Sequence, residues 1–224
     1  MRPRKKPNLA PRLAACESIV LKDPVSLKGH IRETFPNPQA PLHLEIGCGK
    51  GGFVFEMARR NPDINFVAVE REPNVAVIAT ERVLSAVPPL PNIRFILDDA
   101  EKLPQIFLPG ELERIYINFC DPWHKHRQFK RRLTYRERLK TYQNLLLPGG
   151  EIWFKTDNYN LYHFSLYEFA AAFPAYFTTN NLHQSECAEG NVMTEYETHF
   201  SSLGQPIYAI RAKKTAEPGK APTP

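Results

Sequence analysis

The chain of 224 residues lacks most of the patterns that mark metal-binding, secreted or membrane-spanning proteins. Its four cysteines, Cys16, Cys48, Cys120 and Cys187, are scattered and form no C-x-x-C pair. This spacing argues against a zinc site and against a disulfide framework, and it fits a reducing compartment. The seven histidines include no H-E-x-x-H motif. The sequence therefore predicts no bound metal.

Long apolar runs are missing as well. No apolar stretch reaches the roughly 18 residues that cross a bilayer. The basic N-terminus followed by residues 13–16 superficially resembles a lipoprotein signal, but Pro11 and Arg12 interrupt the segment that would have to be apolar. We therefore expect a cytoplasmic protein with no membrane partner.

The chain does carry a moderate excess of positive charge. It has 29 Lys and Arg against 24 Asp and Glu, giving a formal net charge of +5, which fits an anionic partner without establishing one. Its length fits one domain with at most a small appendage. Residues 1–38 read as a basic, proline-rich arm lying over the domain or over a partner, with disorder as the alternative. We expect the main domain at residues 39–214 and a disordered tail at residues 215–224.

Strand and helix patterns alternate along the main domain. Strands are predicted at residues 42–46, 65–69, 93–97, 115–120 and 152–154, and helices from residue 53, from residue 73, at 133–147 and at 159–173. Two further strands, at 176–182 and 207–211, have no crossover helix between them and are expected to be antiparallel neighbours. The pattern predicts an α/β, Rossmann-like fold with a seven-stranded, mostly parallel sheet and an antiparallel last strand. This arrangement is typical of class I S-adenosylmethionine-dependent methyltransferases.

The first predicted strand runs into a glycine-rich turn. Gly47, Gly49 and Gly52 have the G-x-G-x-x-G spacing, in which the missing Cβ atoms let a cofactor lie against the backbone. The spacing alone has low specificity. It predicts a cofactor site at this turn only together with the acidic residues nearby.

Acidic residues lie close to the carboxyl ends of the first three strands. Glu45 comes two residues before the glycine turn, Glu70 follows the second strand, and Asp99 follows the third. The carboxyl ends of parallel strands line one crevice, which is where open α/β sheets bind ligands. The alternative, that each acid caps a loop and meets solvent, is weaker for three successive strands than for one.

The fourth strand is followed by Asp121, Pro122 and Trp123. An acid, a proline and an aromatic residue at this position resemble the motif with which amino-group methyltransferases hold a target base, by stacking and by hydrogen bonds to the base edge. The alternative is a proline turn with the indole packed inside.

A strongly basic stretch comes next, with aromatic residues interleaved and one acid. Its members are His124, Lys125, His126, Arg127, Lys130, Arg131, Arg132, Arg136, Arg138 and Lys140. Because solvated charged faces usually mix signs, we interpret Arg127, Lys130, Arg131 and Arg132 as a track for RNA phosphates. A plain solvated face is the alternative.

Two later segments carry further polar candidates. Asp157 follows the fifth strand, where residues 156–158 also suit a helix cap. Thr194, Glu195, Tyr196 and Glu197 have the spacing of a capping box, and taken alone that structural interpretation is the better one.

Taken together, these motifs resemble the bacterial tRNA (guanine-N7)-methyltransferase family over about residues 40–211. The matching pieces are residues 45–51, 69–70, 99–100, 121–127, 130–134, 156–157 and 194–197. The Asp-Pro-Trp-x-Lys-x-Arg run is highly specific, whereas the glycine loop is generic to methyltransferases. Gln128 departs from the histidine frequent in the family, and the N-terminal arm and the loop around Cys187 are also unlike it.

The resemblance implies transfer of a methyl group from S-adenosylmethionine to a tRNA guanosine, in the variable loop as expected from the family. It implies that a set of acids contacts the cofactor or lines its pocket, namely Glu45, Glu70, Asp99 and Asp121. Asp121 is also the implied catalytic residue. The guanosine would be held by Lys125, Asp157 and Thr194 to Glu197, so Glu197 is expected to be functional as well as structural.

Three other functions are compatible with parts of the sequence. A nicotinamide-dependent oxidoreductase shares the glycine spacing and an acid near Glu70, but no second domain remains to hold its substrate. A non-catalytic RNA-binding protein would not need the acids. A DNA or protein-glutamine methyltransferase would have an Asn-Pro-Pro-aromatic turn, and residues 121–123 match that motif poorly. The sequence leaves open whether the protein is a monomer or a homodimer.

Overall fold

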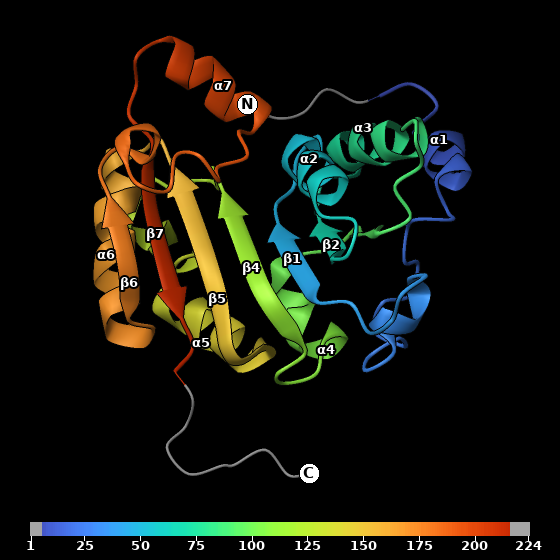
Figure 1. Ribbon diagram of the computed structural model, residues 1–224, viewed down its shortest axis with the longest axis horizontal. Coiled ribbons are helices and arrows are strands. Elements are labelled where there is room, and N and C mark those ends of the chain that lie inside the picture. The colour runs from blue at the N-terminus through green and yellow to red at the C-terminus, as the bar shows by residue number, and fades with distance from the viewer. Residues whose placement is uncertain (1–5, 216–224) are drawn as a thin grey trace.

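A computed structural model of the chain describes residues 6–215, and its centre is one seven-stranded sheet (Figure 1). The strand order is β3-β2-β1-β4-β5-β7-β6. The strands are β1 (Leu42–Ile46), β2 (Asn65–Val69), β3 (Ile93–Ile96), β4 (Leu112–Asn118), β5 (Leu146–Thr156), β6 (Ala175–Thr179) and β7 (Tyr208–Lys213). Strands β1 to β5 pair in parallel, and β7 is antiparallel to both β5 and β6. The predicted fold class is confirmed.

Helices cover the sheet on both faces (Figure 1). The helices of the described residues are α1 (Leu9–Ala15), α2 (Gly52–Arg60), α3 (Pro73–Leu84), α4 (Leu103–Ile106), α5 (Arg136–Leu145), α6 (Tyr159–Ala172) and α7 (Glu195–Ser202), with short 3₁₀ turns η1 (Ile31–Thr34), η2 (Ala100–Lys102), η3 (His126–Arg131) and η4 (Leu182–Gln184). Phe53 and Met57 of α2 pack with β2 in one apolar cluster. Leu139 of α5 and Phe169 of α6 pack with the strands in another.

The chain order creates a switch point between β1 and β4. From β1 the chain runs outward to β2 and β3, whereas β4 starts the other half of the sheet on the opposite side of β1. The loops that follow β1 and β4 therefore leave the sheet in diverging directions, and a crevice opens between them at the carboxyl edge. This edge faces upward in Figure 1.

Two predicted boundaries around β5 are corrected. The helix expected at residues 133–147 is limited to α5 and preceded by η3, and the strand expected at 152–154 begins at Leu146. The residues between them extend the ladder, because the N–H of Gly149 donates to the carbonyl of Lys214 and the N–H of Lys214 donates to that of Gly150. Pro148 cannot continue a helix, but it is tolerated in this peripheral part of a strand.

The described part of the N-terminal segment packs against the β3 side of the domain. Val20 forms a parallel bridge with Phe95 of β3, and the guanidinium of Arg12 donates twice to the carboxylate of Glu81 on α3, at 2.6 Å each. Ile31 is fully buried in the core. The expected boundary after residue 38 stays a prediction. The expected tail lies outside the described residues except for Thr215.

Candidate functional site

A cleft of 680 Å³ opens at the carboxyl edge of the sheet, at the switch point. Its size is that of a typical small-molecule site. Residues at or just after the ends of β1, β2, β3 and β4 line it: Ile46, Gly47, Val69, Glu70, Arg71, Asp98, Asp99, Phe119, Cys120, Asp121 and Trp123. Four of the predicted cofactor-binding residues, Gly47, Glu70, Asp99 and Asp121, are therefore brought together although they are far apart in sequence.

The glycine loop leaves its backbone open. Gly47 and Gly49 have φ values of 76° and 58°, and a Cβ atom built on either meets no atom within 4 Å. Gly51 has a different role, since a Cβ there would lie 2.7 Å from the Cβ of Ala79 and would separate α2 from α3. The open space at Gly47 and Gly49 suits a ligand lying against the backbone, because glycine adopts positive φ without steric cost.

Backbone donors fix the two carboxylates on the β2 and β3 side of the cleft. The N–H groups of Gly49 and Glu72 donate to the two oxygens of Glu70, at 3.0 and 2.9 Å. Asp99 accepts from the N–H of Glu101 at 3.0 Å and so caps η2. Each carboxylate oxygen can accept a further hydrogen bond, so both residues retain capacity for hydroxyl or amino donors of a ligand.

Arg71 is a cleft residue that sequence reasoning missed. Its two terminal nitrogens lie 3.6 Å from Oδ2 of Asp99 and 3.6 Å from Oδ2 of Asp121. The guanidinium thus links the acid after β3 to the acid after β4. The only signal in the sequence is that Arg71 directly follows Glu70, and nothing in that adjacency reveals which acids it contacts.

Glu45 lies beside the cleft and does not line it. The residue is 2% exposed. Its Oε1 accepts from the side-chain amide of Asn118 at 2.9 Å, whereas Oε2 has no hydrogen-bond partner among the described residues. Burial raises the pKa of Glu45 to about 7, although the hydrogen bond from Asn118 and the charge of Lys155 oppose the shift.

The turn after β4 holds its residues in an unusual backbone conformation. Phe119 and Trp123 have φ values of 50° and 43°, which bulky residues rarely adopt. Asp121 lies between them, with its side chain 70% exposed. Trp123 lines the cleft and carries the guanidinium of Arg131 over its ring at 5.1 Å. Backbone strain of this kind persists where the surrounding structure holds it, commonly at functional sites.

Arg132, which was expected to belong to the RNA track, lies inside the protein. It is 4% exposed and stacks on Phe129 and Phe164, with its guanidinium carbon 3.7 and 4.2 Å from the ring centroids. It also donates to the carbonyls of Pro122 and Trp123. Arg132 therefore supports the turn after β4 from inside, and its guanidinium is taken up by these internal contacts.

Only part of the basic stretch is available at the surface. Arg136 is paired with Glu168 and Arg138 with Glu101. Lys125, Arg127, Lys130 and Arg131 are exposed. These four cations remain the candidates for contact with an anionic partner.

The last group of predicted residues gathers beside β4 and β5. Thr194 and Glu197 form the predicted capping box at the start of α7. The ring of Tyr196 lies 5.2 Å from that of Phe119, which lines the cleft. Burial, the negative charge of Asp157 and a hydrogen bond with it together raise the pKa of Tyr196. Tyr196 and Asp157 therefore lie together next to Phe119, beside the cleft.

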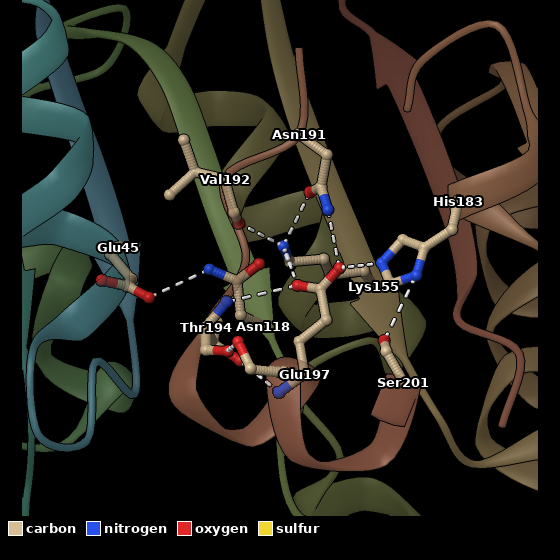
Figure 2. A network of polar contacts seen from close by, with 10 residues as sticks. Glu45, Asn118, Lys155, His183, Asn191, Val192, Thr194, Glu197 and Ser201 are labelled. Carbon is tan, nitrogen blue, oxygen red and sulfur yellow. Dashed lines mark hydrogen bonds and ion pairs between the residues drawn. The ribbon is translucent and has the colours of Figure 1, made fainter. Parts of the chain in front are cut away.

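Glu197 is fully buried, and both of its carboxylate oxygens have partners within the protein. Its carboxylate pairs with Lys155 and accepts from Asn191 and His183 (Figure 2). Burial alone would raise the pKa of Glu197, but the ammonium of Lys155 and these hydrogen bonds lower it. The expectation that Glu197 holds guanosine directly thus has no support in its contacts. Glu195 instead pairs with Arg82 of α3.

Residues 6–215 contain no cluster of three or more Asp, Glu, His or Cys side chains placed to hold a metal ion. Within the same residues, no helix is both long and apolar enough to cross a membrane.

The fold, the open glycine loop and the acids of the cleft define a class I S-adenosylmethionine-dependent methyltransferase. A family model described as "Putative methyltransferase" matches residues 39–210. Solved structures with this fold include a 16S rRNA methyltransferase (TM-score 0.58, 16% identity, 79% of this chain and 88% of that one). Another is the 16S rRNA (adenine(1408)-N(1))-methyltransferase of Catenulisporales acidiphilia with SAM (TM-score 0.55, 13% identity, 97% and 95% covered).

Sequence relatives identify the family more narrowly. The chain is 49% identical over 191 residues to a tRNA (guanine-N(7)-)-methyltransferase of Brevibacillus brevis, covering 85% of this chain and 88% of the relative. It is 43% identical over 219 residues to the protein of the same name from Bacillus cytotoxicus, covering 97% and 99%. The chain belongs to the tRNA (guanine-N(7)-)-methyltransferase family.

Proposed function

We propose that the protein transfers a methyl group from S-adenosylmethionine to N7 of a guanosine in tRNA. The observation that carries this proposal is the convergence of Gly47, Glu70, Asp99 and Asp121 on one cleft, in a chain that belongs to this family. The glycine loop and the acids fit the donor, because they offer open backbone and hydrogen-bond acceptors. The expected setting is the cytoplasm, and the variable loop is the expected target region.

The donor supplies an electrophilic methyl group carried by a positively charged sulfur. Gly47 and Gly49 leave room for it against the backbone. Glu70 is assigned to the ribose hydroxyls and Asp99 to the adenine amino group, because both carboxylates retain acceptor capacity in the cleft. Glu45, buried behind the glycine turn, contributes negative charge near that end of the cleft.

Asp121 is assigned to the acceptor. Guanine N7 has an in-plane lone pair and no proton, so no general base is needed to make it a nucleophile. The task of the protein is therefore alignment together with stabilisation of the positive charge that arrives on the purine. A carboxylate at Asp121 suits that charge, and it can also accept from the N1–H and N2–H edge of guanine, which adenine lacks. Phe119, Trp123 and Tyr196 offer ring faces for stacking beside it.

The exposed cations Arg127, Lys130 and Arg131 are assigned to the tRNA phosphates. They follow directly after the acceptor turn, and Arg131 reaches back over Trp123. A phosphate track in this position would guide an RNA toward the cleft. Lys125, Asp157 and residues 194–196 are assigned to the guanosine itself, with Glu197 acting behind them.

The proposal is tested with an unmodified tRNA transcript and a methyl-labelled donor. Borohydride–aniline treatment cleaves the RNA at 7-methylguanosine, so the cleavage position locates the modified base. We expect labelled RNA and a single cleavage position. Label without aniline cleavage would show that another atom is methylated, and no label with a donor that binds would refute a catalytic role. Sedimentation of the protein alone separates a monomer from a homodimer.

A further inference from the structure

A buried lysine of the sheet, Lys155, bonds to the segment that carries the residues proposed to hold the guanosine. Lys155 lies on β5 and is 5% exposed. Its ammonium has three N–H donors, and all three have acceptors: Oδ1 of Asn191 at 2.9 Å, the carbonyl of Val192 at 2.7 Å, and Oε2 of Glu197 at 2.5 Å (Figure 2). Burial lowers the pKa of Lys155, and the charge of Glu197 opposes that shift.

The partner carboxylate collects the remaining polar contacts of the same segment. Glu197 accepts from Asn191, from the backbone N–H of Thr194, and from Nε2 of His183. Ser201 in turn contacts Nδ1 of His183. Residues 183–201, which have no strand of their own in the structure, are thus organised around Glu197, and Lys155 connects that centre to the sheet.

The position of Lys155, the anchor of this segment, explains where the side chains proposed to hold the guanosine lie. Residue 155 is two residues from Asp157, and its carbonyl accepts from the N–H of Phe119. The anchored segment places Tyr196 against the Phe119 ring at 5.2 Å. It also places Glu195 against Arg82, next to the glycine loop, where a Cβ on Gly52 would touch both side chains. The ammonium of Lys155 thus connects the segment that carries residues 194–196 to β5, next to the cleft.

A purely structural need would not favour this arrangement. A buried ion pair contributes little net stability compared with apolar residues of the same shape, because both charges lose their hydration. The advantage of the buried lysine is geometric, since three hydrogen bonds from one nitrogen specify a single position for the segment. Positional precision matters here because the proposed reaction depends on alignment.

We propose that Lys155 is a positioning residue, which holds residues 194–196 at the acceptor side of the cleft and so orders the pocket for the guanosine. This inference rests on the proposed function. Lys155 does not contact the reacting atoms; it acts through Asn191, Val192 and Glu197. Loss of the anchor should therefore affect the use of tRNA and leave the binding of the donor intact.

The test compares Lys155→Met with wild type and with Lys213→Met. Lys213 is exposed at the end of β7, so the control makes the same chemical change on the same sheet. For Lys155→Met we expect about a hundredfold loss of kcat/KM for tRNA with the Kd for donor changed by no more than about twofold. Hydrogen exchange of the amides at residues 190–198 should accelerate in this variant. Lys213→Met should leave all three measurements unchanged.

A milder variant covers the case in which Lys155→Met fails to fold. Asn191→Ala removes one acceptor of the ammonium and one donor to Glu197 while the ion pair remains, and we expect about a tenfold loss of kcat/KM for tRNA. Wild-type tRNA kinetics in a variant with accelerated exchange would overturn the inference. So would an equal loss of donor affinity and tRNA turnover. Failure of the wild-type protein to methylate guanosine N7 would instead overturn the proposed function.

Discussion

The buried carboxylate of Glu45 allows a quantitative test of the electrostatics beside the cleft. Burial raises the pKa of Glu45 to about 7 from an ordinary value of 4.5, with the Asn118 hydrogen bond opposing the shift. Between these two pH values the folded protein keeps a proton that the unfolded chain has released. The free energy of unfolding is therefore expected to fall as the pH rises from 4.5 to 7, and the full loss is present above pH 7.

The magnitude follows from the pKa difference. Each pKa unit corresponds to about 1.36 kcal/mol, so a rise of about 2.5 costs about 3 kcal/mol above pH 7. Glu45→Gln removes the charge and keeps an oxygen that can accept from Asn118. We expect the variant to be more stable than wild type by up to about 3 kcal/mol at pH 8, with the difference disappearing near pH 5.

Urea denaturation followed by tryptophan fluorescence at pH 5, 6, 7 and 8 measures this difference. Glu186→Gln, the same exchange at an exposed position, is the control. A stability difference between Glu45→Gln and wild type that does not change with pH would refute the reasoning. In binding experiments at pH 8, Glu45→Gln should weaken affinity for S-adenosylmethionine more than affinity for S-adenosylhomocysteine, because only the former carries the sulfonium charge.

Three further predictions concern the acceptor turn and the basic stretch. Asp121→Ala should lower kcat by about 10²- to 10³-fold while the donor still binds in calorimetry; near-wild-type turnover would remove Asp121 from the mechanism. Lys130→Ala combined with Arg131→Ala should reduce the slope of log K against log salt for tRNA by about 1.5, and an unchanged slope would show that these residues do not contact phosphates. Arg132→Ala should lower stability by about 1–3 kcal/mol through lost stacking and hydrogen bonds while leaving that slope unchanged, and a reduced slope would place Arg132 on the RNA.

The sheet was predictable because its signals are local. Residues 66–69 form a continuous apolar run, and residues 42–46 carry apolar side chains at every second position; both strands are buried along their whole length, as expected for strands covered on both faces. The prediction that β6 and β7 are antiparallel neighbours is confirmed, although α7, which the sequence pattern did not reveal as a helix between them, lies in the connection. The predicted start of β5 was wrong because the first part of the strand is fixed by pairing with Lys214. No local sequence pattern reveals that contact.

The convergence of Glu70, Asp99 and Asp121 on one cleft follows from parallel topology and could also be predicted. What the sequence could not show is which charges meet. Ten basic residues in one stretch look like a single positive surface, yet Glu168 and Glu101, distant in sequence, neutralise Arg136 and Arg138. The number of cations available to RNA depends on these tertiary pairs.

The same limitation applies to the two ends of the cleft. Arg71 follows the acid assigned to the donor ribose, yet its guanidinium lies between Asp99 and Asp121, and so between the residues assigned to donor and acceptor. A cation in this position reduces the repulsion between two carboxylates that would otherwise face each other across the cleft. It also means that neither acid can be changed without altering the charge near the other. The donor and acceptor sites therefore share one electrostatic environment, and measured effects at Asp99 and Asp121 are expected to be non-additive.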